Sequence, residues 1–322
     1  MPEEIAPNWF RMRIPLPDTP LKELNSYLIK GEERNLLIDT GLNRPECLQA
    51  MQSGLQELKV DLSKTDLFIT HLHVDHIGLA SRLVRPGRRV SLNRFDADVI
   101  RNWAGFDPML EYAKACGFPA ELLRTALDRH PGFKFRSDQI PELTLLTEDA
   151  VLTCSGYHLY CLHTPGHSPG HLCLYEPERK ILVSGDHILG DITPNIQCWS
   201  NDRNPLQDYL DSLDKLAGFQ VDQVLPGHRE LFRDLGTRVR QLREHHEQRV
   251  DEALDCLAKD EATPYQVAAA MTWDLDCDSW DDFPVTQKWF ATGEAVAHLR
   301  FLEEKGKVQR TKKNDLFFFS LA

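Results

Sequence analysis

Short apolar runs alternate with helix-like stretches in the first part of the chain. Apolar and β-branched runs bounded by turns are typical of strands, whereas longer stretches of mixed character are typical of helices. Strands are predicted at Asn25–Ile29, Asn35–Ile38, Asp66–Thr70 and Arg89–Leu92, and helices at Pro45–Lys59 and Ile77–Leu83. This order of strands and helices is the pattern of an α/β domain.

The alternation breaks between Phe95 and His130, where the sequence predicts two or three helices rich in aromatic residues. We expect this helical insertion to cover about 95–135. Strands then return, followed by one helix and a last strand. The strands are predicted at Leu143–Leu146, Val151–Cys154, His158–Leu162, His171–Tyr175, Ile181–Ser184 and Gln223–Leu225, with the helix at Gln207–Leu216.

The residues after about 235 have a different, mainly helical pattern. Thr263 and Gln266 form a capping box, with proline at the first helical position, that predicts the start of a short helix. Longer helices are predicted at Gly236–Leu257 and Val285–Lys305, and a terminal hairpin at Lys307–Gln309 and Leu316–Ser320. We therefore predict a main domain over 1–235 and a small winged-helix-like domain over 236–322.

Composition and charge narrow the classes of function. The 322 residues are 42% hydrophobic and 27% charged, which is ordinary for one large or two average globular domains. We find no apolar run of 18 residues and no secretory signal in residues 1–14. A net charge of −12 opposes binding to nucleic acid and to anionic membranes. The eight cysteines form no CxxC pair, so we expect free thiols in a cytoplasmic protein.

Four side chains of metal-ligand type lie within six positions, directly after an apolar strand. They are His71, His73, Asp75 and His76. His71 and His73 differ by two positions and point the same way on extended backbone, and the chain then turns toward the next helix. Zinc, manganese and iron accept such nitrogen and oxygen ligands. The plainer alternative is a polar turn with incidental histidines, which this density of ligands disfavours.

Three further residues repeat this design. His167, Asp186 and His228 each come directly after a glycine that follows an apolar strand. Taken singly, each would be an ordinary loop residue. Because all three follow strand ends, we expect them to join the first four at one edge of the fold.

The order HxHxDH, His, Asp, His resembles the metallo-β-lactamase superfamily over about residues 25–231. The segment Leu37–Gly41 is similar to that family's early Asp-Thr-Gly turn. The resemblance implies a four-layer αββα sandwich with two metal ions at one edge of its two sheets. It implies one ion held by His71, His73 and His167, another held by Asp75, His76 and His228, a bridging Asp186, and a supporting Asp39.

The resemblance also implies metal-dependent hydrolysis. A water between two divalent ions about 3.5–4 Å apart loses a proton near neutral pH and attacks a carbonyl carbon or a phosphorus. Asp75 is the expected catalytic residue, which would orient this hydroxide and accept a proton. Zinc is the expected metal, with manganese and iron as alternatives. Asp75 and His76 stand where the zinc β-lactamases proper have a cysteine, which argues against antibiotic degradation.

Other histidines are weaker candidates. His171 and His187 are either outer neighbours of the metal ligands or, more simply, packed residues of the strands. His245 and His246 lie in a charged helix and are expected to be solvated.

The predicted insertion raises a question about substrate. About 91 residues separate His76 from His167, so the extra helices would lie near the mouth of the metal cleft. Their aromatic residues either form an apolar lid over an acyl group or attach the insertion to the rest of the chain. These residues are Trp103, Phe106, Tyr112 and Phe118.

The sequence leaves three functions open. The first, which we favour, is hydrolysis of a small-molecule ester, thioester or lactone. The second is cleavage of RNA or another phosphodiester. Charge opposes it, because residues 236–322 hold 12 Lys and Arg against 16 Asp and Glu, with five acids in Asp274–Asp282 and one basic cluster at Lys305–Lys313. The third is a winged-helix interaction protein with a structural metal, which would need only four ligands. A homodimer is compatible with the sequence.

Overall fold

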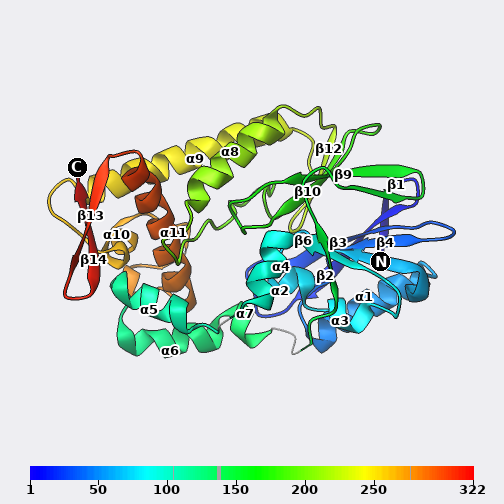
Figure 1. The fold of residues 1–322 in the computed structure, drawn as a ribbon, viewed down its shortest axis with the longest axis horizontal. Coiled ribbons are helices and arrows are strands. Elements are labelled where there is room, and N and C mark those ends of the chain that lie inside the picture. Colours follow the sequence, from blue (N-terminus) through cyan, green and yellow to red (C-terminus); the bar gives the residue numbers. More distant parts are fainter. Residues whose placement is uncertain (104, 136–138, 276) are drawn as a thin grey trace.

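Two mixed β-sheets pack face to face in the computed structural model, which describes residues 1–103, 105–135, 139–275 and 277–322 (Figure 1). The first sheet consists of β1 (Glu3–Ala6), β2 (Trp9–Leu16), β3 (Lys22–Ile29), β4 (Asn35–Ile38), β5 (Thr65–Phe68), β6 (Val90–Asn93) and β7 (Leu143–Leu146). Its strands lie in sequence order, antiparallel from β1 to β4 and parallel from β4 to β7. Residue 104 of the predicted insertion and Asp276 of the acidic stretch lie outside the described residues.

In the sequence, the strands of the second sheet follow directly after β7 of the first. It consists of β8 (Val151–Cys154), β9 (Tyr157–His163), β10 (Leu172–Glu176), β11 (Ile181–Gly185) and β12 (Gln223–Pro226). The spatial order is β12-β11-β10-β9-β8, with β11 and β12 parallel and the other neighbours antiparallel. All five strands are predicted from the sequence to within one residue at each end.

β1 and β2 have no counterpart among the predicted strands. β2 pairs with β3 along its full length and buries Trp9 and Ile14. Its polar positions do not alternate cleanly, because Arg11 is also buried, where it forms ion pairs with Glu3 and Glu230. A buried arginine on the inner side of a strand hides the period of two that marks strands in a sequence.

Helices cover the outer face of each sheet. α1 (Pro45–Glu57) and α3 (Ala80–Leu83) pack on the first sheet, and α8 (Pro205–Ala217) and α9 (Leu235–Cys256) pack on the second. Buried apolar side chains, among them Phe68, fill the space between the sheets. This arrangement removes the apolar face of every layer from water and confirms the predicted α/β sandwich of two sheets flanked by helices.

The helix predicted at Ile77–Leu83 is divided in the structure. α2 (Val74–Ile77) begins directly after His73 and α3 follows at Ala80. Leu79, between them, donates its N–H to the carbonyl oxygen of Gly41 at 3.1 Å, so this N–H is not available to continue one helix. The break therefore attaches the His71–His76 loop to the Asp-Thr-Gly turn.

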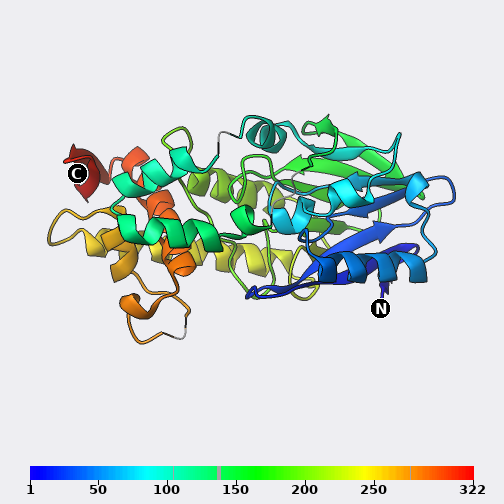
Figure 2. The ribbon, with the colours of Figure 1, turned by 90° about the horizontal axis from the view of Figure 1, so that it is seen from below.

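The helices described between β6 and β7 are α4 (Arg94–Arg101), α5 (Asp107–Ala115), α6 (Ala120–Arg129) and α7 (Pro131–Lys134). α4 packs against β6 and β7, whereas α5 and α6 lie beside the C-terminal elements (Figures 1 and 2). The ring of Phe118 lies 5.6 Å from that of Trp289, and Tyr112 lies 5.6 Å from Phe317. These two aromatic residues thus attach the helices to the C-terminal part, the second of the two roles considered for them.

The C-terminal part has its own apolar cluster, which involves α9, two further helices and a hairpin. These elements are α10 (Pro264–Ala270), α11 (Val285–Glu304), β13 (Val308–Lys313) and β14 (Leu316–Leu321). The capping box of Thr263 and Gln266 is present at the start of α10, as predicted. Short 3₁₀ turns lie at Leu62–Lys64 and Trp280–Asp282.

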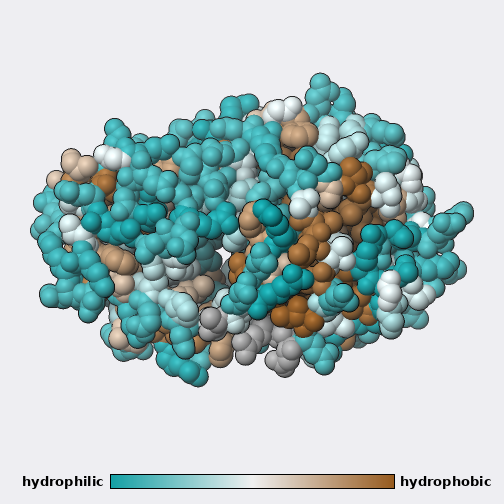
Figure 3. All heavy atoms as spheres, in the orientation of Figure 1, coloured by the Kyte–Doolittle hydropathy of each residue, from teal (hydrophilic) through white to brown (hydrophobic). Residues whose placement is uncertain are grey.

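The surface differs between the two ends of the molecule. Hydrophobic side chains gather over the sheets, whereas the side that carries α8 and α9 is mostly hydrophilic (Figure 3). Among the described residues, no helix combines the length and the apolar character that crossing a membrane requires.

Candidate metal centre

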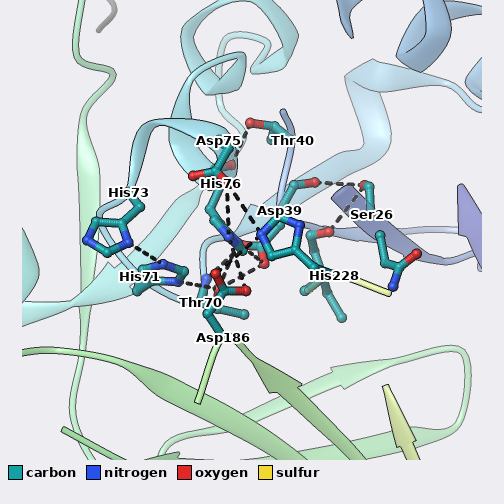
Figure 4. A network of polar contacts seen from close by, with 12 residues as sticks. Ser26, Asp39, Thr40, Thr70, His71, His73, Asp75, His76, Asp186 and His228 are labelled. Atoms are coloured by element: carbon teal, nitrogen blue, oxygen red, sulfur yellow. Dashed lines mark hydrogen bonds and ion pairs between the residues drawn. The ribbon is translucent and has the colours of Figure 1, made fainter. Parts of the chain in front are cut away.

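All seven predicted ligands gather where strands of the two sheets end. The loop after β5 carries His71, His73, Asp75 and His76, the β9–β10 turn carries His167, and Asp186 and His228 follow β11 and β12. Their side chains form three overlapping groups whose ligand atoms lie within 4.8 Å of one another. The groups are His71–His73–His167, His71–His76–Asp186 and Asp75–His76–His228. Figure 4 shows most of these rings and carboxylates turned toward one another.

The spacing of the nitrogen atoms fits ligands that share an ion. Nε2 of His71 lies 3.0 Å from Nδ1 of His73. Two nitrogen atoms bound tetrahedrally at metal distances of 2.0–2.1 Å would lie about 3.3 Å apart. The separation in the structure is close to that value, and the ring of His167 lies within 5.0 Å of both neighbouring rings.

Asp186 stands between the groups. Its Oδ1 lies 3.4 Å from Nε2 of His76, and its Oδ2 lies 3.3 Å from Nε2 of His228 and 3.8 Å from Nε2 of His167. Gly227 makes room for this carboxylate, because a Cβ at that position would lie 2.3 Å from Oδ1. Asp186 is thus placed where it can contact cations on both sides.

The rings are oriented by hydrogen bonds from their other nitrogen. Nδ1 of His76 lies 2.8 Å from Oδ2 of Asp39, while Nδ1 of His167 and of His228 donate to backbone carbonyls at 2.9 and 2.8 Å. This leaves Nε2 of each ring facing the centre, buried and without a hydrogen-bond partner among the described residues. Imidazoles with one nitrogen bonded to the protein and the other directed at a shared point are typical metal ligands, so the residues fit a metal site.

Asp39 supports this arrangement in the way the resemblance implies. Its Oδ1 accepts the N–H of Thr70, and its Oδ2 accepts the hydroxyl of Thr70, each at 2.8 Å. Asp39 itself has a φ of 56°, a left-handed conformation that costs free energy for a residue with a Cβ. This strained conformation lies where the carboxylate contacts both Thr70, at the start of the His71–His76 loop, and His76.

The electrostatic environment differs across the centre. Burial lowers the pKa of His73 to about 3. Burial alone would also lower the pKa of His228, but Asp186 and Asp75 outweigh it and raise that pKa to about 10. Burial would raise the pKa of Asp75, yet His76 and His228 lower it to about 2. The side with Asp75 and His228 therefore favours positive charge, which a metal cation brings.

Asp96 is a supporting residue that sequence reasoning missed. It lies in α4, is fully buried, and accepts the N–H of Leu72 at 2.8 Å, the hydroxyl of Ser168 at 2.8 Å and the N–H of Gly170 at 2.6 Å. Leu72 lies between His71 and His73, and Ser168 follows His167 in the sequence. One carboxylate thus joins the two loops that deliver these three histidines. A buried Asp near the start of a helix carries no spacing signal for such a role.

Three of the four weaker candidates, His171, His187 and His246, are also buried. His171 and His187 lie behind the ligands, in none of the three groups, and His171 contacts the hydroxyl of Thr164 through Nδ1 at 2.9 Å. The prediction that His246 is solvated is wrong, because it is buried and its Nδ1 lies 3.2 Å from Nε2 of His298. His245 is half-buried. α9 packs on α11 at this point, so a helix of high charge still has an inner side.

Comparisons with known proteins agree with this geometry. Residues 22–228 match the Metallo-beta-lactamase superfamily, and residues 281–320 match the C-terminal domain of metallo-beta-lactamase-like proteins. A solved structure, a metallo-beta-lactamase family protein from Thermus thermophilus, is 27% identical and superposes with a TM-score of 0.83 over 99% of this chain and 100% of its own.

Two curated relatives have names that specify an activity. The human acyl-coenzyme A thioesterase MBLAC2 is 29% identical over 220 residues, which are 65% of this chain and 74% of the relative. An atrochrysone carboxyl ACP thioesterase from Aspergillus fumigatus is 25% identical over 221 residues, 69% of this chain and 55% of the relative. The match over residues 22–228 covers more than half of the chain, and the chain therefore belongs to the metallo-β-lactamase superfamily.

Proposed function

We propose that this chain is a metal-dependent hydrolase of acyl thioesters, with small esters and lactones as related substrates. The observation that carries the proposal is the convergence on the carboxylate of Asp186 of three buried Nε2 atoms that have no hydrogen-bond partner in the part of the chain that the structure describes. Nitrogen atoms without partners in a protein interior are costly unless another group satisfies them. The two relatives named as thioesterases favour the thioester among the acyl substrates.

The proposed centre holds two divalent ions. His71, His73 and His167 would hold one ion, Asp75, His76 and His228 the other, and Asp186 would contact both. Zinc is the first candidate, with manganese and iron as alternatives, because imidazole and carboxylate ligands suit all three. When bound, such ions lower the pKa of a water and polarise a carbonyl oxygen.

Asp75 has the position expected of a proton acceptor at this centre. Its Oδ2 lies 3.4 Å from Nε2 of His228, and its side chain is about 16% exposed, more than that of Asp186. A carboxylate with a pKa of about 2 is ionised near neutral pH. Asp75 would therefore orient a water by accepting its hydrogen.

The hairpin charges weigh against the nuclease alternative. Lys313 pairs with Glu261, Lys312 with Asp315, and Arg310 lies 3.3 Å from Glu303. A path for single-stranded nucleic acid needs basic side chains that are free to contact phosphates. The alternative of a structural metal is also disfavoured, because seven converging ligands exceed the four of a closed structural site.

The test combines metal analysis with a substrate panel. Protein purified without added ions is analysed for metal, then assayed with acyl-coenzyme A, acyl-glutathione and lactones in the presence of zinc, manganese or iron. We expect thioester hydrolysis by the loaded protein and none by His73→Ala. Silence of the loaded protein across the panel, or full turnover by demetallated His73→Ala, would contradict the proposal. A salt-sensitive shift with single-stranded RNA would instead favour the nuclease.

A further inference from the structure

A segment after β11, residues 195–199, lies between the metal centre and helix α11 of the C-terminal part. His167 donates its Nδ1–H to the backbone carbonyl of Asn195 at 2.9 Å. The side chain of the same Asn195 donates from Nδ2 to Oε2 of Glu294, also at 2.9 Å. Two hydrogen bonds therefore connect a candidate metal ligand to a helix that begins more than 100 residues later in the chain.

The segment is held on α11 by further contacts. The N–H of Cys198 donates to the carbonyl oxygen of Gly293 at 3.0 Å, and Trp199 stacks on Trp289 with ring centroids 4.2 Å apart. A Cβ on Gly293 would lie 2.9 Å from Cβ of Gln197 and from the ring of Trp199. Glycine thus allows the segment to lie directly against α11, and this contact fixes the position of the Asn195 carbonyl relative to the helix.

Glu294 is unusual for a residue that only joins two parts of a fold. It is 8% exposed, and Asn195 is its hydrogen-bond partner among the described residues, with Nε of Arg249 at 3.8 Å. Burying a carboxylate with so few partners costs free energy, and burial raises its pKa to about 7. An apolar residue would pack here at lower cost, so the position requires a hydrogen-bond acceptor for Asn195.

We propose that Glu294 is a positioning residue for the metal centre, which holds the Asn195 carbonyl where it orients His167. The C-terminal helix is in this respect part of the metal site. A hydrogen bond at Nδ1 fixes both the tautomer and the direction of a ligating imidazole, and partners of this kind affect metal affinity about 10–100-fold. The inference rests on the proposed metal centre but not on the choice of substrate.

The test compares two glutamates of the same helix. Glu304 accepts a hydrogen bond from Nδ2 of Asn204 at 2.8 Å, which is the same kind of contact to the main domain but is remote from His167. Glu294→Ala, Glu294→Gln and Glu304→Ala are loaded with zinc, and affinity is measured by competition with a chelator. Cobalt-loaded samples report ligand geometry through their visible absorption.

We expect Glu294→Ala to bind one of its ions about 10–100-fold more weakly and to change the cobalt spectrum. Glu294→Gln, whose amide oxygen still accepts from Asn195, should retain most of the affinity, and Glu304→Ala should match the wild type. If Glu294→Ala folds poorly, Gly293→Ala offers a second test, since its Cβ would displace the segment and weaken the same ion.

Three results would overturn the inference. They are a Glu294→Ala protein with wild-type affinity and spectrum, an equal loss in Glu304→Ala, and a Glu294→Gln protein as impaired as the alanine variant. The wild type is measured first, because a wild-type protein that binds no metal would contradict the proposed function itself. The two failures are therefore distinguishable without any assay of turnover.

Discussion

Two buried aspartates, Asp39 and Asp96, support opposite sides of the metal centre by different contacts. Asp39 accepts from the backbone and hydroxyl of Thr70 and also contacts Nδ1 of His76. Asp96 accepts from two backbone N–H groups and one hydroxyl, and none of these three donors belongs to a ligand ring. Asp39 thus acts on a ligand itself, whereas Asp96 acts on the loops that carry ligands.

Asp39 is therefore expected to act mainly through its charge, and Asp96 mainly by fixing the positions of loops. The carboxylate of Asp39 is bonded to an imidazole, so its charge reaches any cation that the imidazole binds. Asp96 contributes three hydrogen bonds that fix loop positions, and a neutral acceptor could in principle replace part of them. The two sites are therefore expected to respond differently to substitution.

Asp186→Ala should have the largest effect on metal binding, because the carboxylate of Asp186 faces histidines of both proposed ligand groups. We expect bound metal and thioester hydrolysis to fall to background, since three imidazoles lose the carboxylate that they share. Elemental analysis and the acyl-coenzyme A assay check this. Asp191→Ala, an exposed acid in the following loop, is the control and should retain both. Retention of both ions by Asp186→Ala would show that the two sides are independent.

Asp39→Asn should weaken metal binding about 10–100-fold. Asparagine has nearly the shape of aspartate, but it lacks the charge, and one terminal atom becomes a donor that faces either Thr70 or His76. Competition with a chelator measures the affinity, and circular dichroism confirms the fold. Wild-type affinity in this variant would mean that the charge of Asp39 does not reach the centre.

Asp96→Ala should have a smaller effect, about ten-fold on the affinity for one ion, because it loosens loops without removing charge from a ligand. The matched control is Asp98→Ala on the same helix, where the side chain is exposed. In a double variant with Asp39→Asn, the losses of metal-binding free energy should add, since Asp39 and Asp96 share no hydrogen-bond partner. A strongly non-additive double variant would contradict the assignment of the two aspartates to separate sides.

The same two residues show what the sequence can and cannot predict about the site. Asp39 precedes Thr40 and Gly41 at the end of a strand, so a local motif identifies it, as spacing and strand ends identify the seven ligands. Asp96 and Glu294 act through backbone groups and an asparagine far away in the sequence. Every residue type except proline can supply a backbone N–H, and contacts of this kind therefore leave no pattern in one sequence.

The fold follows a similar division. The strands of the second sheet are confirmed because each is either a short apolar run or an alternation of buried and exposed positions between turns, and both patterns are local. β2 is missed because the buried Arg11 forms an ion pair with Glu230, which is distant in the sequence. His246 is wrongly expected to be solvated because its partner, His298, lies on another helix. Local pattern predicts an element, but the partner of a buried polar side chain depends on tertiary structure.

Asp96 should also change how stability depends on pH. Burial raises its pKa to about 6, although its three donors oppose the shift. A carboxyl whose pKa is higher in the folded state stabilises the fold below its unfolded pKa of about 3.8, and this contribution is lost as pH rises through about 6. The free-energy difference between wild type and Asp96→Asn should therefore be larger at pH 4 than at pH 7, by about 2 kcal/mol. Urea unfolding of both proteins in chelator measures it, with exposed Asp98→Asn as the control. A difference that instead grows with pH would show that the three donors stabilise the ionised carboxylate more than burial penalises it, and Asp96 would then resemble Asp39 in acting through charge.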